Sequence, residues 1–139
     1  MKSNNMENIL RKADRKTSGG DKQYSMFIGR WQPWHEGHRW LIDQKLNVGD
    51  NVLLCIRDVE VDTNNPWSAQ EIVDNLNAEL ADLINDGRVK LLIIPDIKSI
   101  NFGRGVGYDI VEHLPPDEIS DISGTKIREK MGINGNKNI

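Results

Sequence analysis

The stretch YSMFIGRWQPWHEGH occupies residues 24–38 and joins an apolar run to a polar, histidine-containing segment. Tyr24–Ile28 has the composition of a short buried strand, and Gly29 ends it. A helix is expected to begin near His38 and to run to Leu46. If the strand is central in a parallel sheet, the segment after it lies at the carboxyl edge, where α/β proteins bind ligands.

Strand and helix signals alternate along the rest of the chain. Ser68–Ile84 has apolar residues at helical spacing, begins with a Ser68/Glu71 capping box and is followed by Gly87. The other expected elements are strands at Asn51–Ile56, Val89–Ile94 and Tyr108–Leu114, and a last helix at Thr125–Met131. This alternation predicts an α/β fold with a parallel sheet flanked by helices.

Composition limits the domain organisation and the partners. The chain has 139 residues and a net charge of −3, which predicts one domain and argues against a protein that coats nucleic acid. Residues 1–22 are polar and partly basic, so we expect a flexible extension there and a single domain over residues 23–139. No apolar run predicts a membrane span. Cys55 is the single cysteine and lies in an expected buried strand, which favours a reducing, cytoplasmic location.

His35 and His38 lie three residues apart at the expected junction of loop and helix, so both can face one pocket. Gly29 lets the backbone approach a ligand closely, and Gly37 leaves room for a phosphate. With Arg30 and a helix N-terminus nearby, these residues favour a polyphosphate. The alternative is a zinc site, but the spacing differs from H-E-x-x-H and a third ligand is missing.

Residues 35–38 resemble the H-x-G-H signature of the nucleotidylyltransferase superfamily. Ile122–Arg128 reads ISGTKIR and is similar to the I-S-x-T-x-x-R signature that this family carries near its C-terminus. The resemblance covers about residues 24–131. It implies a Rossmann-like fold and the transfer of a nucleoside monophosphate from a triphosphate to a phosphate-bearing acceptor, with release of pyrophosphate.

The resemblance also assigns roles to residues. His35, His38, Lys126 and Arg128 match the catalytic positions, and Arg30 would help to neutralise the phosphates. The expected nucleotide-binding residues are Gly29, Arg30, Trp31, Gly37, Ser123, Gly124 and Thr125. Ser123 also suits an N-cap, and Lys126 and Arg128 place charge within one turn of that helix start. Mg²⁺ is expected to arrive with the triphosphate, without a dedicated protein site.

The nucleotide is not settled by the sequence. Gly29–His35 is similar to the opening of the nicotinamide-mononucleotide adenylyltransferases, and Asn65–Ser68 resembles a second segment of those enzymes. The short chain and its ending are similar to the glycerol-3-phosphate cytidylyltransferases, which make CDP-linked products. Pro116–Ser120 stands where those enzymes carry Arg-Thr-Glu-Gly. ATP is slightly favoured over CTP, and a nucleotide-binding module without catalysis is the other alternative.

The acceptor is expected to be a phosphorylated small molecule. Arg57 and Arg104 are candidates for contacts with its phosphate, and Trp67, Phe102 and Tyr108 are candidates for stacking on a ring. Asp58 is a candidate for a water-mediated contact. Related enzymes are often oligomers, so a homo-oligomer is possible by analogy.

Overall fold

Three parallel strands and five helices make up the described part of the chain, which comprises residues 23–104 and 107–133 of the computed structural model. In chain order the elements are β1 (Tyr24–Gly29), α2 (Glu36–Leu46), β2 (Asn51–Asp58), α3 (Ala69–Glu79), α4 (Ala81–Asn85), β3 (Val89–Pro95), α5 (Asp117–Ser120) and α6 (Gly124–Lys130). The expected α/β fold with a parallel sheet is confirmed, and the arrangement is consistent with a small Rossmann-like domain. The expected extension at residues 1–22 lies outside the described residues.

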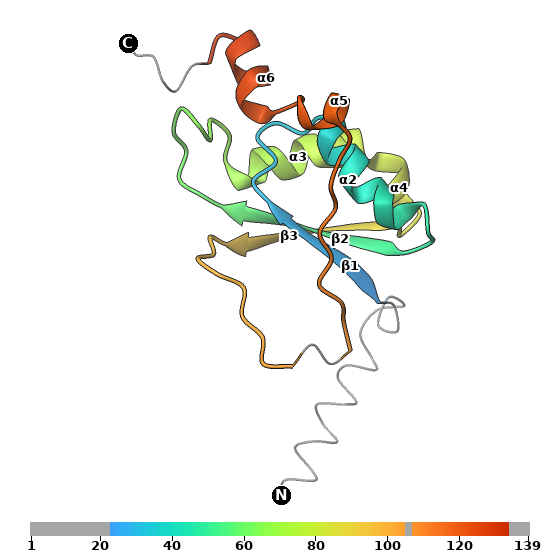
Figure 1. Cartoon of the computed structure of the whole chain (residues 1–139). Coiled ribbons are helices and arrows are strands. Elements are labelled where there is room, and N and C mark those ends of the chain that lie inside the picture. The colour runs from blue at the N-terminus through green and yellow to red at the C-terminus, as the bar shows by residue number, and fades with distance from the viewer. Residues whose placement is uncertain (1–22, 105–106, 134–139) are drawn as a thin grey trace, which may run out of the picture.

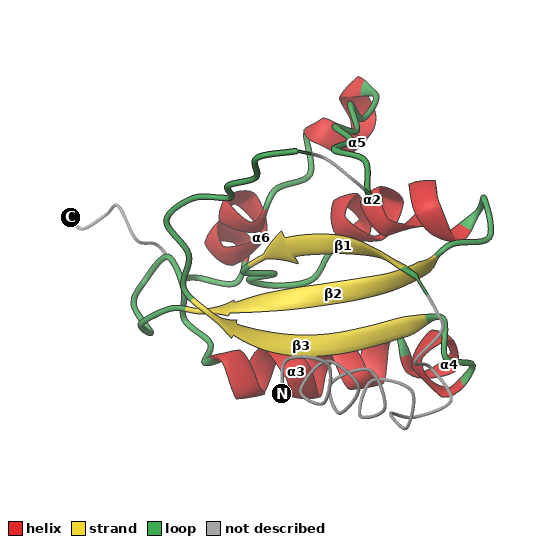
Figure 2. Ribbon diagram, turned by 90° about the horizontal axis from the view of Figure 1, so that it is seen from below, coloured by secondary structure: helices red, strands yellow, loops and turns green. Residues whose placement is uncertain are grey.

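The sheet has the strand order β1-β2-β3, with β2 in the middle (Figure 2). Both crossovers step in the same direction across the sheet, and right-handed crossovers then place their helices on the same face. Figure 1 shows α2, α3 and α4 together on that side. The segment between β3 and α5 leaves the sheet on the opposite side (Figure 1).

The core lies between this face of the sheet and the helices. Phe27, Leu54 and Leu91 are paired in register and therefore point to the same face. The side chains with the least exposure come from β2, α2 and α3: Val52, Leu54, Ile56, Ile42 and Leu76. This packing holds the carboxyl ends of the strands in place beside the loop that follows β1.

The opposite face of the sheet has little cover among the described residues. Met26 on β1 is 59% exposed, and Leu92 on β3 is 46% exposed. Cys55 also belongs to this face by register but is buried, as expected for a small apolar residue in a strand. Within residues 23–104 and 107–133, every helix is too short or too polar to cross a bilayer.

Two expected elements are wrong or incomplete. The single helix expected at Ser68–Ile84 is divided into α3 and α4, because Leu80 leaves the helical conformation at φ −116° and ψ 24°. This break lets Leu83 and Ile84 pack against the core. The capping box of Ser68 and Glu71 is present as expected.

The strand expected at Tyr108–Leu114 is absent from the described residues of that segment. Tyr108, Ile110 and Leu114 are all exposed there. Strand propensity acts mainly through packing against neighbours, and these side chains stay exposed instead of packing on the sheet. His113 stacks on Phe27 at a centroid distance of 6.1 Å, so the segment lies beside β1 without joining the sheet.

Candidate functional site

An open cleft of about 290 Å³ lies where the loop after β1, the end of β2 and the start of α6 meet. It is at the carboxyl edge of the sheet, where parallel α/β folds place their ligands. The residues that line it come from both quoted signatures and from β2: Gly29, Arg30, Trp31, Gln32, His38, Arg57, Gly124, Thr125 and Arg128. The fold therefore brings together two segments that are far apart in the sequence.

The two histidines cap the start of α2. His35 is the N-cap residue, and its Nδ1 accepts hydrogen bonds from the backbone N–H groups of Gly37 at 3.0 Å and His38 at 3.4 Å. His38 Nδ1 in turn accepts from the backbone N–H of His35 at 3.3 Å. This is a capping box in which imidazoles take the usual places of Ser and Glu. Helix α2 begins at Glu36, two residues before the expected start, because this cap begins at His35.

The cap also sets which ring nitrogen carries the proton, and burial sets the pKa of the rings. Because each Nδ1 accepts a backbone hydrogen bond, the neutral ring carries its proton on Nε2, which is free to donate. The rings stack with a centroid distance of 3.6 Å. Burial, and then the adjacent His35, lower the pKa of His38 to about 3. Burial also lowers the pKa of His35. His38, which lines the cleft, is therefore a neutral N–H donor at physiological pH.

Gly37 lies against the ring of the N-cap histidine. A Cβ added at Gly37 would lie 2.9 Å from Cε1 of His35 and 3.0 Å from its Nδ1. The missing side chain thus makes room for the capping imidazole of His35. Gly37 is also absent from the residues that line the cleft, and so is His35.

Gly29 and Trp31 form the inner wall of the cleft. A Cβ at Gly29 would lie 2.9 Å from the Trp31 indole, so the glycine makes room for that ring as well. Trp31 is buried, its Nε1–H donates to the carbonyl of Cys55 at 2.9 Å, and its ring meets His38 edge-on at 4.8 Å. Its φ of 55° is rare for a bulky residue and is held by these contacts. Trp31 therefore supports His38 and leaves little of its own surface for a nucleotide.

Arg128 joins the second signature to the first. Its Nη1 donates to the backbone carbonyl of Gln32, and its Nη2 donates to Thr125 Oγ1 at 3.2 Å. Burial, and then the positive charge of Arg30, lower the pKa of Arg128. An arginine nonetheless remains charged, so two guanidinium groups lie close together in one cleft. Such a cleft favours an anion with more than one negative charge.

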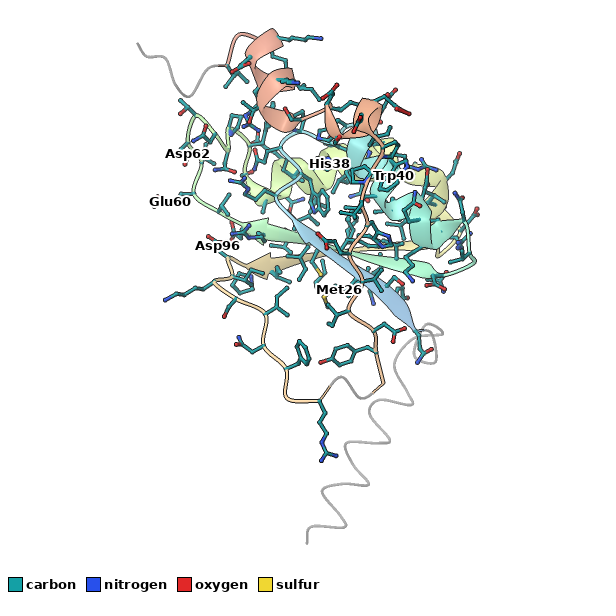
Figure 3. All side chains as sticks on the ribbon, in the orientation of Figure 1. Met26, His38, Trp40, Glu60, Asp62 and Asp96 are labelled. Carbon is teal, nitrogen blue, oxygen red and sulfur yellow. The ribbon has the colours of Figure 1, made fainter. Side chains whose placement is uncertain are left out.

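The loop between β2 and α3 holds Arg30. Arg30 Nη1 donates to Asn65 Oδ1 at 3.1 Å, and Asn65 Nδ2 donates to Asp62 Oδ1 at 3.1 Å. The backbone hydrogen bond from Asn65 is the largest of the causes that lower the pKa of Asp62. Figure 3 shows Glu60, Asp62 and Asp96 along one side of the molecule, past the ends of β2 and β3. The arginines of the cleft thus have an acidic border on this side.

Ser123 and Lys126 of the second signature make contacts within their own segment. Ser123 Oγ accepts from the backbone N–H of Lys126 at 3.1 Å, so it is the N-cap of α6. Lys126 Nζ donates to the carbonyl of Asp121 at 3.1 Å, and Lys126 does not line the cleft. A Cβ at Gly124 would lie 2.9 Å from the carbonyl oxygen of Gln32. Gly124 therefore permits the close contact between α6 and the loop after β1.

The acceptor candidates are only partly brought to the cleft. Arg57 lines it, while its Nε and Nη2 donate to Asp96 Oδ1 at 2.9 and 2.7 Å. Trp67 packs against the core and does not line the cleft. Its backbone carbonyl accepts a hydrogen bond from Gln32, which does line it. The remaining candidates are exposed in the segment after β3 and do not line the cleft: Phe102, Arg104 and Tyr108.

Sequence reasoning missed Gln32, Asn65 and Asp62 as site residues. Gln32 and Asn65 are the buried polar residues of the described chain, at 6% and 7% exposure. Two sequence signals could have indicated them: the Gln32 amide lies among tryptophans, and Asn65 precedes a proline. Amide groups that become buried in such places are usually hydrogen-bonded.

No protein-family model matches this chain.

Proposed function

We propose that this protein is a nucleotidylyltransferase that transfers a nucleoside monophosphate from a nucleoside triphosphate to a phosphate-bearing small molecule. Pyrophosphate is the second product. The observation that carries this proposal is the contact between Arg128 and the Gln32 carbonyl, which joins segments 96 residues apart. It places Arg30, Arg128 and His38 around one cleft at the carboxyl edge of the sheet.

In the proposed reaction, an oxygen of the acceptor phosphate attacks the α-phosphorus of the triphosphate. The new P–O bond forms as the bond to the β-phosphate oxygen breaks, and no covalent enzyme intermediate is involved. His38 donates its Nε2–H to a phosphate oxygen on which negative charge builds up. Because the ring is neutral at physiological pH, it acts as a hydrogen-bond donor rather than as a general acid.

Arg30 and Arg128 neutralise the β- and γ-phosphates and hold the triphosphate for in-line attack. Thr125 supports the guanidinium of Arg128. Among the described residues, no group of three or more His, Cys, Asp or Glu side chains could hold a metal ion. We propose that Mg²⁺ comes with the triphosphate, where it would supply charge neutralisation of the phosphates.

ATP is slightly favoured over CTP, because Gly29–His35 and Asn65–Ser68 are similar to segments of adenylyltransferases. Both segments also contribute to the cleft region, through Arg30 and Asn65. A cytidylyltransferase that makes a CDP-linked polyol or amino alcohol remains the alternative. The first test is a thermal-shift panel with ATP, CTP, GTP and UTP, each with and without Mg²⁺, since a ligand of the folded state raises the melting temperature.

The decisive test is pyrophosphate release from the stabilising nucleotide in the presence of a set of phosphorylated acceptors. His38→Ala should reduce turnover by about 10² or more, because it removes a donor to developing charge. His113→Ala is the matched control, since His113 packs on Phe27 and lies outside the cleft. Nucleotide binding without pyrophosphate release would favour the non-catalytic module. An active His38→Ala variant would contradict the proposal.

A further inference from the structure

Gln32 connects the loop after β1 to two other segments, the start of α3 and helix α6. Gln32 is 6% exposed, in a segment that also carries Trp31, Pro33 and Trp34. Its Nε2 donates to the carbonyl of Trp67 at 2.8 Å, and its Oε1 accepts from the backbone N–H of Trp67 at 3.1 Å. This reciprocal pair ties the loop after β1 to the start of α3. Both polar atoms of the Gln32 side chain are thus engaged by the backbone of Trp67.

The backbone of the same residue contacts α6. The carbonyl of Gln32 accepts a hydrogen bond from Arg128 Nη1, and α6 approaches that carbonyl so closely that Gly124 has no room for a Cβ. The position of this carbonyl therefore sets the direction of the Arg128 guanidinium. The carbonyl in turn depends on the peptide that the Gln32 side chain anchors to Trp67.

We propose that Gln32 is a positioning residue, whose side chain fixes its own carbonyl and thereby aims Arg128 into the cleft. Its effect on turnover rests on the proposed function, whereas its effect on Arg128 does not. Without the amide, the backbone N–H and carbonyl of Trp67 lose their partners, and the loop must move to satisfy them. A shift of about 1 Å in a group that binds the reacting phosphates can cost about 10² in rate.

The test compares Gln32→Leu with Gln44→Leu in the full chain. Gln44 also donates its side-chain amide to a tryptophan carbonyl, that of Trp40 at 2.9 Å, but it does not line the cleft. Binding of inorganic tripolyphosphate and of the stabilising nucleotide is measured by calorimetry. Gln32→Leu should weaken both by about tenfold or more and reduce kcat, while Gln44→Leu should leave both unchanged.

A double-mutant cycle separates positioning from general destabilisation. If Gln32 acts through Arg128, then adding Gln32→Leu to Arg128→Ala should change tripolyphosphate affinity little further. Fully additive losses would overturn the proposal, because they would show that the two residues act independently. Gln32→Glu is the second variant: it keeps an acceptor for the Trp67 N–H and loses the donor to the Trp67 carbonyl. It should weaken binding in the same direction.

NMR of the arginine side chains tests the inference without any nucleotide. In the wild type, the hydrogen bonds of Arg128 to Gln32 and Thr125 should slow rotation of its guanidinium, and Gln32→Leu or Gln32→Glu should speed it. Unchanged rotation in folded variants would overturn the proposal. If the wild type binds no nucleoside triphosphate, the proposed function fails, and the NMR result still decides the role of Gln32.

Discussion

Replacing His38 by glutamine should make the protein more resistant to acid. His38 is the N3 residue of the capping box at the start of α2, and glutamine is an ordinary residue at that position. The variant therefore keeps a side-chain acceptor for the backbone N–H of His35 and removes a titratable group. The effect of the substitution on pH dependence isolates the protonation of this one ring.

The size of the effect follows from the lowered pKa. Burial, and then His35, hold the pKa of His38 at about 3 in the folded state. The unfolded chain binds this proton at about pH 6.5. Stability is therefore fully present above that pH and is lost as pH falls toward 3. At pH 4 the loss is about 2.5 pH units at about 1.4 kcal/mol each, or about 3.5 kcal/mol, of which a small part has already occurred at pH 7.

Urea denaturation at several pH values measures this loss. Between pH 7 and pH 4 the free energy of unfolding of the wild type should fall by about 3 kcal/mol more than that of His38→Gln. Between pH 7 and pH 8 the two curves should run parallel, which serves as the internal control. Parallel curves down to pH 4, or an NMR titration of the His38 ring near pH 6.5, would refute both the burial and the neutral-donor role.

Three further outcomes are expected. Gly37→Ala should destabilise the fold by about 1–3 kcal/mol in urea denaturation, since its Cβ would lie 2.9 Å from a ring atom of the N-cap histidine. Gly103→Ala, with nothing within 4 Å of its Cβ, should be nearly neutral. Arg128→Ala should weaken triphosphate binding by about tenfold or more in calorimetry, and Lys126→Ala much less; equal losses would contradict the site geometry. Deleting residues 1–22 should leave nucleotide affinity unchanged, because both quoted signatures lie within residues 24–131; a loss would show that the segment contributes to binding.

The elements that could be predicted from sequence are those set by local signals. The three strands of the sheet were expected within two residues of their bounds, because apolar runs of this kind suit a parallel sheet. The start of α3 was expected from Ser68 and Glu71, which form the capping box within four residues of each other. These patterns depend on neighbours in the chain, so a single sequence carries them.

The roles of the glycines could not be predicted, because they depend on where a distant or flexible side chain folds. The sequence suggested that Gly29 and Gly37 leave room for a ligand, and it gave no sign of their contacts with Trp31 and His35. The importance of Gln32 was missed for the same reason. Its partners are Trp67, 35 residues away, and Arg128, 96 residues away.

The strand expected at Tyr108–Leu114 shows the opposite limit, where a local signal is overridden. Its residue types favour a strand, but a strand becomes stable through the surface it pairs with and packs against. The segment contacts the sheet through His113 on Phe27, and its larger apolar side chains remain exposed. Propensity alone was therefore not enough to predict a fourth strand.

The use of histidine in the cap of α2 has a physical reason that links stability to function. A Ser-x-x-Glu box would satisfy the same backbone N–H groups, but its carboxylate would bring negative charge to a cleft that holds Arg30 and Arg128. An imidazole fills the cap with Nδ1 and keeps Nε2–H on the other side of a rigid ring. In His38 the backbone hydrogen bond of His35 thus fixes the tautomer, and the stacked rings fix the direction of the donor. Because one ring performs both tasks, the donor is oriented in advance; for the proposed reaction, this is the condition under which such a group contributes most to lowering a barrier.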